Sequence, residues 1–242
     1  MKRFYVPPEC ITGEEATIPE EQRKHIENVL RLKPGAEILV FDGNGKEYKA
    51  RIKTLYPSIS CHIICPSPNS TFDRVNITLV QGIAKGEKMD LIIQKCTEIG
   101  ISTFIPCLTE RTIIKLDKAG AAKKRERWQK IVRSATEQSY GTIVPEVTEV
   151  RPFNDVIKGL SKQSLNLIPW EEEKCQSIKQ VLRKADSREI TVFIGPEGGF
   201  SEQEVQAARE YGAIPVSLGR RILRTETAGL VAAAIIKYEL DL

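Results

Sequence analysis

The chain has 242 residues, of which 36 are Lys or Arg and 32 are Asp or Glu, giving a formal net charge of +4. This length suits one large or two small domains with a well-buried core, and so small a charge does not by itself imply a nucleic-acid partner. No run approaches the ~18 apolar residues of a membrane helix and no signal peptide leads the chain, so we expect a cytoplasmic protein with no membrane partner.

Predicted strands dominate the N-terminal part of the chain. Alternating or β-branched apolar runs predict strands at residues 1–6, 37–41, 47–52 and 59–63, with one helix at about 19–31. The Asp-Gly-Asn-Gly sequence at residues 42–45 has strong hairpin chemistry. We therefore expect a small β-barrel domain over residues 1–68, followed by a linker in the Pro-, Ser- and Asn-rich stretch at residues 66–71.

Strands and helices alternate through the remainder, residues 72–242. Strands are expected at residues 76–81, 103–108, 165–168, 190–194 and 214–218. Helices are expected near residues 87–99, 119–139, 153–160, 175–185, 201–211 and 225–239. This alternation predicts an α/β domain, in which helices cover both faces of a parallel sheet.

The six cysteines show no disulfide framework, so we expect reduced thiols. Cys61, His62 and Cys65 are of metal-ligating types, but the alternation over residues 59–63 is typical of a strand, and the only other histidine is His25. We therefore expect no metal site.

A glycine-rich turn follows the apolar run at residues 190–194. Three glycines lie among residues 195–199 beside Pro196. Glycines allow positive φ and let a ligand approach the backbone closely. Ser201 and Glu204 have capping-box spacing, so a helix should begin there. The alternative interpretation is an ordinary tight strand-to-helix turn, although such turns rarely need three glycines.

Glu197 indicates which ligand this turn suits. A helix N-terminus attracts anions, yet a carboxylate in the loop disfavours a phosphate and favours hydroxyl donors or a cation. The phosphate-binding spacings G-x-G-x-x-G and G-x-x-x-x-G-K-[ST] are also absent. The turn thus favours a phosphate-free nucleoside ligand with ribose hydroxyls and a positive centre, and S-adenosylmethionine has those properties.

A second glycine-bearing turn, at Leu218 and Gly219, follows the strand expected at residues 214–218. Ile222 and Leu223 could cover a flat ring there. Ligands of α/β proteins bind beyond the carboxyl ends of strands, so two such turns predict a ligand crevice. The small residues of the next helix would allow close packing, as a core helix or as a dimer face.

These motifs resemble those of the RsmE family of ribosomal RNA methyltransferases. Most specific are Gly-Pro-Glu-Gly-Gly-Phe-Ser at residues 195–201 and the segment at residues 218–228, which contains Arg-Ile-Leu-Arg-Thr-Glu-Thr-Ala. Further matches lie at residues 85–89, 94–100, 110–111, 127–128, 137–139 and 144–146, with a looser one at residues 25–35.

The resemblance implies a SPOUT-class enzyme that uses S-adenosylmethionine to methylate N3 of a uridine in the 16S rRNA of the small ribosomal subunit. It also implies a C-terminal trefoil knot, an N-terminal PUA-like RNA-binding domain and a homodimer whose active sites are completed by the partner. The residues expected to bind the cofactor are Ile168, Pro169, Trp170, Ile194, Gly195, Pro196, Glu197, Gly199, Leu218, Gly219, Arg221, Ile222, Leu223 and Thr227.

The helix near residues 119–139 is the best local candidate for binding nucleic acid. Trp128, Ile131, Val132 and Ala135 have the spacing of one buried stripe, which leaves the basic residues elsewhere on the helix. A solvated helix face is the alternative. The residues expected to contact RNA are Lys85, Lys88, Lys124, Arg127 and Arg133.

Methylation of N3 requires alignment of donor and acceptor and removal of the N3 proton. Both histidines lie in the N-terminal domain, so we do not expect a histidine base. Arg224 or Arg111 are candidates for stabilising the developing oxyanion. Glu226 or Glu137 are candidates for orienting the arginine or accepting the proton. Each could instead form a structural ion pair. A paired base is unreachable, so the uridine must be unpaired or flipped out.

The chain departs from the family pattern at Gly141, where the family usually carries an arginine, so it lacks whatever contact that arginine makes. Tyr140 could replace it by stacking on a base. Two other functions stay open, namely methylation of a ribose 2′-hydroxyl and RNA binding without catalysis. The second turn argues against the former, and the intact pair of turns argues against the latter.

Overall fold

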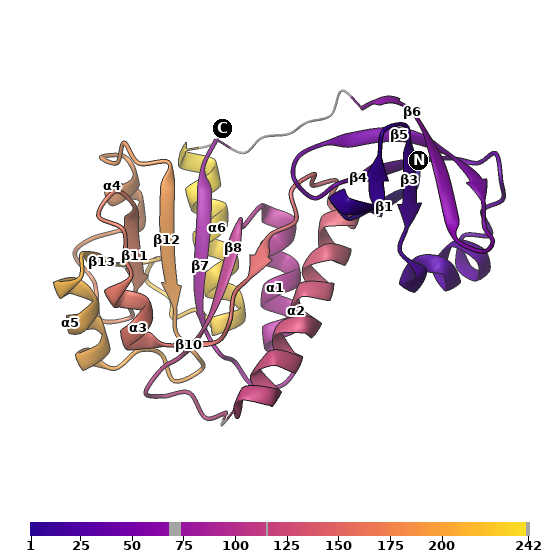
Figure 1. Cartoon of the computed structure of the whole chain (residues 1–242). Helices are drawn as coiled ribbons and strands as arrows, with labels where there is room; N and C mark the ends of the chain where they lie inside the picture. Colours follow the sequence, from indigo (N-terminus) through magenta and orange to yellow (C-terminus); the bar gives the residue numbers. More distant parts are fainter. Residues whose placement is uncertain (68–73, 115, 241–242) are drawn as a thin grey trace. The chain divides into compact units, whose positions relative to one another are not determined.

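The chain divides into two units in a computed structural model that describes residues 1–67, 74–114 and 116–240 (Figure 1). The N-terminal unit comprises Met1–Phe72 and Thr136–Val144, and the C-terminal unit comprises Asp73–Ala135 and Pro145–Leu242. Most of the predicted linker, from residue 68 onward, lies outside the described residues.

A curled six-stranded sheet forms the N-terminal unit, in the order β1-β4-β5-β6-β3-β2. β4 and β5 pair antiparallel across the predicted hairpin turn, where Gly43 and Gly45 have φ of 78° and 101°. Positive φ is a conformation that glycine adopts without steric cost, so the hairpin prediction is confirmed. The strands are β1 (Arg3–Tyr5), β2 (Ile11–Thr12), β3 (Glu15–Ile18), β4 (Glu37–Phe41), β5 (Glu47–Thr54) and β6 (Ile59–Pro66).

The helix predicted at residues 19–31 is only partly formed. Ile26 is fully buried in the core of the unit, and Arg31 has a left-handed φ of 52° that stops the helix. Tertiary packing here overrides the local helical pattern and widens the last turn into a π-helix. The short helices of the unit are the 3₁₀ turns η1 (Pro8–Cys10) and η2 (Glu20–Gln22) and the π-helix η3 (His25–Val29).

Arg3 is a buried charged residue that ties the sheet to residues 136–144 of the same unit. Its Nε lies 2.6 Å from Oε1 of Glu47, and both side chains are under 5% exposed. The guanidinium also donates to three carbonyl oxygens of that segment, at 2.8 to 3.2 Å, and lies 4.4 Å from the centroid of the Phe41 ring. A buried charge is tolerated only when it is paired and hydrogen-bonded, and Arg3 meets both conditions.

A parallel sheet forms the C-terminal unit, in the order β10-β8-β7-β12-β11-β13, with β9 beside β8. Contacts join α1 (Lys88–Ile99), α4 (Ile178–Leu182) and α6 (Thr225–Leu240) into one layer. In another layer, α3 (Phe153–Lys158) packs with α5 (Glu202–Glu210), so helices cover both faces as predicted. Figure 1 shows α6 passing behind β7 and β12. The strands are β7 (Asn76–Gly82), β8 (Thr103–Leu108), β9 (Glu146–Val147), β10 (Arg151–Pro152), β11 (Leu165–Pro169), β12 (Glu189–Ile194) and β13 (Ala213–Val216).

The helices of this unit lie where the sequence predicts them. Ser201 and Glu204 form the predicted capping box at the start of α5, and Trp128, Val132 and Ala135 are buried along α2. None of the described helices is long and apolar enough to cross a membrane. The helices are α1 (Lys88–Ile99), α2 (Lys118–Gln138, whose last residues belong to the N-terminal unit), α3 (Phe153–Lys158), α4 (Ile178–Leu182), α5 (Glu202–Glu210) and α6 (Thr225–Leu240).

Replacing Arg3 with Met should lower the free energy of unfolding of the N-terminal unit by about 3 kcal/mol, because Glu47 is left buried without its cationic partner. Hydrogen exchange of the β4 and β5 amides measures this loss within the unit. The control is Arg51→Met, since Arg51 pairs with Glu37 on the exposed surface and should contribute less than about 0.5 kcal/mol. Equal effects of the two substitutions would show that burial adds nothing to the Arg3 pair.

Candidate active-site crevice

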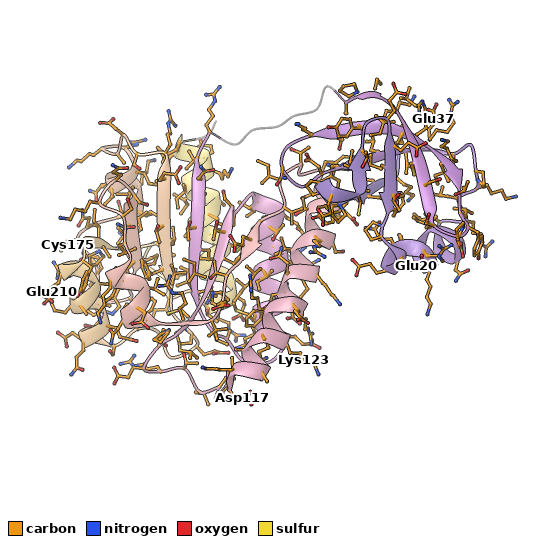
Figure 2. All side chains as sticks on the ribbon, in the orientation of Figure 1. Glu20, Glu37, Asp117, Lys123, Cys175 and Glu210 are labelled. Atoms are coloured by element: carbon orange, nitrogen blue, oxygen red, sulfur yellow. The ribbon has the colours of Figure 1, made fainter. Side chains whose placement is uncertain are left out.

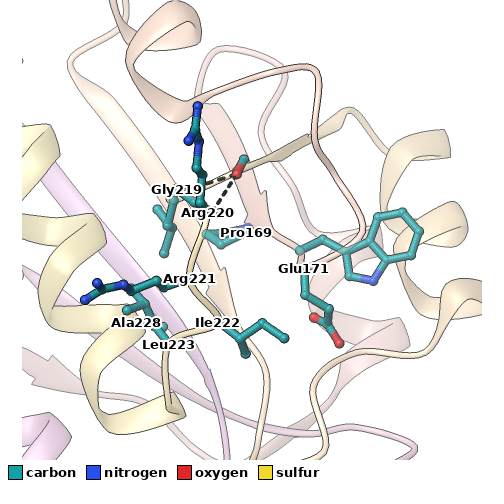
Figure 3. A pocket seen from close by; sticks show the side chains of 11 residues that line it. Pro169, Glu171, Gly219, Arg220, Arg221, Ile222, Leu223 and Ala228 are labelled. Atoms are coloured by element: carbon teal, nitrogen blue, oxygen red, sulfur yellow. Dashed lines mark hydrogen bonds between the residues drawn. The ribbon is translucent and has the colours of Figure 1, made fainter.

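The carboxyl ends of β11, β12 and β13 lie side by side, with β11 in the middle. Two adjoining hollows of about 110 and 420 Å³ open at this edge. Both hollows contact the same five residues, so we describe them as one crevice, and Figure 3 shows the smaller hollow. The shared residues are Pro169, Glu171, Ile222, Leu223 and Ala228. This is the position at which α/β proteins bind their ligands.

The turn after β12 forms the first wall of the crevice. Gly199 has φ of 68°, and a Cβ added to Gly195 would lie 2.9 Å from the carbonyl carbon of Gly199. At the end of β7, a Cβ added to Gly82 would lie 2.6 Å from the backbone nitrogen of Pro196. Backbone thus packs directly on backbone, and a side chain at Gly82 or Gly195 would push the segments apart.

The turn after β13 forms the second wall. Gly219 has φ of 128°, and its N–H donates to Oγ of Ser217 at 3.2 Å, one of the bonds drawn in Figure 3. Ile222 is 83% exposed, so its apolar side chain is accessible to a ligand in the crevice. Ile222 comes from this wall and Glu171 follows β11, and the side chains of both line the crevice (Figure 3).

Most of the expected cofactor residues line this crevice. Two of them, Ile168 and Thr227, do not line it. Ile168 is fully buried and directly precedes Pro169, and Thr227 lies in the first turn of α6, where its N–H donates to the carbonyl oxygen of Arg224. The lining residues that were expected are Pro169, Trp170, Ile194, Gly195, Pro196, Glu197, Gly199, Leu218, Gly219, Arg221, Ile222 and Leu223.

Several lining residues were not among the predicted site residues, namely Glu171, Gly198, Phe200, Ser217, Arg220, Thr225 and Ala228. Glu171 stands out, because its Oε1 would lie 3.1 Å from a Cβ added to Gly199 and its carboxylate therefore rests against the glycine turn. The signal that could have found Glu171 is its place just beyond the predicted strand that ends at Ile168, at the carboxyl edge of the sheet.

Glu197 is held in its ionised form by its neighbours. Oε1 accepts the backbone N–H of Lys85 at 2.9 Å and lies 3.2 Å from Nζ of Lys88. Partial burial opposes ionisation, but these donors outweigh it and hold the pKa of the Glu197 carboxyl below its ordinary value. Glu197 therefore places an ionised carboxylate, paired with Lys88, at the lining of the crevice at neutral pH.

Arg224, Glu226 and Arg111, three of the four expected catalytic residues, lie at the glycine-bearing turns. Arg224 is 84% exposed at the side chain, and its Nη1 lies 4.0 Å from Oε1 of the mostly buried Glu226. Arg111, in the loop after β8, donates from Nη1 to the carbonyl oxygen of Gly198 at 2.7 Å. Arg224 can therefore reach toward a bound substrate, while Arg111 is held against the first wall.

Glu137, the fourth expected catalytic residue, belongs to the N-terminal unit. Its Oε1 accepts the backbone N–H of Tyr5 at 2.8 Å. Burial raises the pKa of the Glu137 carboxyl, and the Tyr5 N–H and the Arg3 charge oppose that rise. These contacts connect the end of α2 with β1 inside that unit.

The basic residues expected to contact RNA fall into two groups. Lys85 and Lys88 lie beside the first wall, where both engage Glu197. The other three lie on α2. Of these, Arg127 pairs with Asp90, and Nζ of Lys124 lies 5.8 Å from the centroid of the Trp128 ring. Arg133 is half-buried farther along the helix, and Figure 2 marks the exposed Lys123 near its start.

No group of three His, Cys, Asp or Glu side chains in residues 1–67, 74–114 and 116–240 is arranged to hold a metal ion. Burial raises the pKa of Cys61, Cys96 and Cys107 to about 12, so these cysteines remain protonated thiols.

Two family models match the chain. One describes an RNA methyltransferase domain and matches residues 72–237, which include all the residues of the crevice. The other describes an RNA methyltransferase PUA domain and matches residues 18–64. Each match falls within one of the domains expected from the sequence.

Individual relatives match along nearly the whole chain. Ribosomal RNA small subunit methyltransferase E of Bacillus subtilis is 35% identical, over 100% of this chain and 98% of its own length. The enzyme of the same name from Neisseria gonorrhoeae, bound to S-adenosyl methionine, superposes with a TM-score of 0.90 at 36% identity, over 98% of this chain and 97% of its own. A Legionella pneumophila protein in complex with the bound cofactor SAM superposes with a TM-score of 0.83 at 29% identity, over 98% of this chain and 96% of its own. This chain belongs to the family of ribosomal RNA small subunit methyltransferase E.

Proposed function

We propose that the chain is an S-adenosylmethionine-dependent methyltransferase that modifies N3 of a uridine in the 16S rRNA of the small ribosomal subunit. The observation that carries this proposal is the crevice, in which two glycine-bearing turns and an ionised carboxylate meet at the carboxyl edge of a parallel sheet. The relative from Neisseria gonorrhoeae, which has the same fold, is described as bound to S-adenosyl methionine.

The methyl donor is proposed to bind between the two walls. Ile222 and Leu223 supply apolar cover for the adenine ring, and the close-packed glycines let its polar edge reach the backbone. Glu197 supplies a negative charge that suits the ribose hydroxyls or the positive centre of the donor. The proposed donor site includes all the expected cofactor residues. Ile168 and Thr227 do not line the crevice, but their neighbours in the chain do.

The bound donor supplies an electrophilic methyl group, and the residues of the chain must prepare the uridine to receive it. Loss of the N3 proton leaves a negative charge that spreads over the ring oxygens. We propose that Arg224, with Arg111 as the alternative, stabilises this charge. Glu226 or Glu137 orients the arginine or takes the proton. The exposure of Arg224 and its proximity to Glu226 support the first pair.

RNA binding is proposed to involve the PUA-like domain, expected over residues 1–68, and the basic residues of α2 and of the loop after β7. Phosphate contacts from such lysines and arginines would position the RNA without reading its sequence. The methyltransferase domain, residues 72–242, would then act on an unpaired or everted base. An rRNA substrate would place the protein in the cytoplasm.

A SPOUT-type trefoil knot and a homodimer are also proposed for this chain. β12 lies between β7 and β11, both of which precede it in the chain, and such an insertion is compatible with a threaded C-terminal segment. α6 leaves Ala234 and Tyr238 exposed, and this face could be covered by a second copy.

Incubation with labelled S-adenosylmethionine and small subunits from cells that lack this modification should transfer label to N3 of a single uridine. Nuclease digestion followed by mass spectrometry identifies the modified atom. Label on a ribose 2′-oxygen would replace the proposed reaction with the alternative one, and binding of RNA without transfer would show a non-catalytic protein.

Replacing Arg224 with Ala should lower kcat about 100-fold, because charge that develops in the transition state loses its partner. The dissociation constant for S-adenosylmethionine should stay within about twofold, since Arg224 is proposed to face the uridine. Arg183→Ala is the control, because Arg183 is also an exposed arginine paired with a glutamate, Glu239. An unchanged kcat in the Arg224 variant would indicate that Arg111 stabilises the developing charge instead.

Replacing Glu197 with Ala should weaken S-adenosylmethionine binding about tenfold and leave Tm nearly unchanged, because its ion pair with Lys88 is partly exposed. Calorimetric titration measures the affinity. Glu210→Ala, on the outer end of α5 (Figure 2), is the matched surface control.

The lowered pKa of Glu197 fixes the sign of the pH dependence. The carboxylate is ionised above its ordinary pKa of 4.5, so affinity for the donor should be constant from about pH 6 to 8 and fall only on acidification through the lowered value. Loss of affinity within the neutral range would assign binding to another group.

Replacing Lys124 and Arg127 together with Gln should weaken RNA binding and reduce the steepness of its salt dependence by about 0.7 to 0.9 for each lost phosphate contact. Lys179→Gln on α4 is the control, because Lys179 is an exposed helical lysine outside the proposed RNA-binding set. Filter binding at several salt concentrations measures both quantities. An unchanged slope would show that this face of α2 is merely solvated.

A further inference from the structure

A buried chain of hydrogen bonds runs beneath the crevice. Nε2 of Gln81, near the end of β7, donates to Oγ1 of Thr225 at 3.0 Å. Oγ1 of Thr225 in turn donates to the carbonyl oxygen of Gly195 at 2.6 Å. Gln81 is 0% exposed and Thr225 only 6%, so both bonds are shielded from water. We call these two side chains the Gln81–Thr225 tie.

The tie joins the two walls of the crevice to the centre of the sheet. Gly195 begins the first wall, and Thr225 directly follows the residues 222–224 that line the second. Gln81 is on β7, which pairs with β12. Gln81, which lies outside the crevice lining, therefore contacts both walls through Oγ1 of Thr225 and the carbonyl oxygen of Gly195.

The orientation of the Gln81 amide is set by its surroundings. Besides Thr225, Nε2 faces the carbonyl oxygens of Gly82 at 2.9 Å and Gly195 at 3.4 Å. With the amide reversed, its oxygen would meet those acceptors, so the nitrogen must point toward them. Oε1 is buried and finds no partner among the described residues, which is a cost that a purely structural side chain could avoid.

The carbonyl of Gly195 is the group that this arrangement controls. The next residue, Pro196, has a fixed φ and no N–H, so the direction of that carbonyl determines how the turn leaves β12. A Cβ on Gly82 would already clash with Pro196, which leaves the turn little freedom on that side. The tie restrains it on the other.

We propose that Gln81 is a positioning residue for methyl transfer, which acts through Thr225 to hold the two walls at the separation that the methyl donor requires. The inference rests on the proposed donor site. Because Gln81 does not line the crevice, its loss should affect the binding of the donor far more than the chemical step.

Thr225→Val and Gln81→Met keep the approximate size of each side chain and remove the hydrogen bonds. Both variants should raise the dissociation constant and the KM for S-adenosylmethionine about tenfold, with kcat changed less than about threefold. Thr225→Ser retains the hydroxyl and should bind the donor within about twofold of the unchanged protein. Calorimetry and initial rates measure these quantities on the full chain.

Thr97→Val is the matched control. Thr97 is also buried, at 5% exposure, and its Oγ1 donates to the carbonyl oxygen of Ile93 within α1 at 2.8 Å. This substitution should lower Tm much as Thr225→Val does and leave donor affinity unchanged. Wild-type affinity in both Thr225→Val and Gln81→Met, with the same loss of Tm as the control, would show that the tie only stabilises the fold.

The outcomes also separate this inference from the donor site on which it rests. If Glu197→Ala weakens donor binding but the two tie variants do not, the positioning role is wrong and the site stands. If none of the three substitutions changes the affinity, the donor binds elsewhere and both proposals fail. Should Thr225→Val not fold, Gln81→Met and Thr225→Ser still give opposite expected results.

Discussion

The geometry of the crevice depends on two glycines, Gly82 and Gly195, whose lack of a Cβ allows backbone segments to pack closely. At both positions a Cβ would approach backbone atoms of the turn after β12 to less than 3.0 Å. Backbone can pack on backbone this closely only where there is no Cβ. The turn therefore packs directly on the end of β7, so the sheet determines the position of the turn.

Polar contacts then hold the turn from three sides. Thr225 donates to the carbonyl of Gly195, Arg111 donates to that of Gly198, and Glu197 accepts the N–H of Lys85. Each contact comes from a different segment, namely the start of α6, the loop after β8 and the loop after β7. A site supported from several elements loses little freedom when a ligand binds, and such preorganisation favours affinity.

Local signals in the sequence predicted the fold well. The hairpin at residues 42–45 and the capping box of Ser201 and Glu204 depend on neighbouring residues alone, and both are confirmed. The π-helix at His25–Val29 was not predicted, because it results from the burial of Ile26 by strands distant in the chain. The two-residue strands β9 and β10 are too short to show any periodicity.

In the candidate site, too, some residues could be predicted from local sequence and others could not. The two turns could be found because glycine spacing is visible in the sequence, and they do lie along one crevice. Glu171 was missed, although its place just beyond the predicted strand at residues 165–168 could have indicated it. Gln81 could not be found, because its contacts with Thr225 and Gly195 arise only when β7 pairs with β12. Contacts of this kind join residues that are far apart in the chain, and no local pattern records them.

The segment around Gly141 shows how a departure from the family pattern can be read in the structure. Arg3 is the charged side chain next to it and donates to the Gly141 carbonyl at 2.8 Å, but its guanidinium is already committed to Glu47 and other carbonyls of residues 136–144. A buried, fully engaged cation cannot replace an arginine that reaches a substrate. Tyr140 is 62% exposed and has a left-handed φ of 63°, and it is the large aromatic side chain that this segment offers to solvent, beside the 46% exposed Ile143. The centroid of the Tyr140 ring lies 5.4 Å from Cζ of Arg3. A non-glycine residue in that conformation is uncommon, and this backbone conformation holds an aromatic ring, rather than a charge, at the surface.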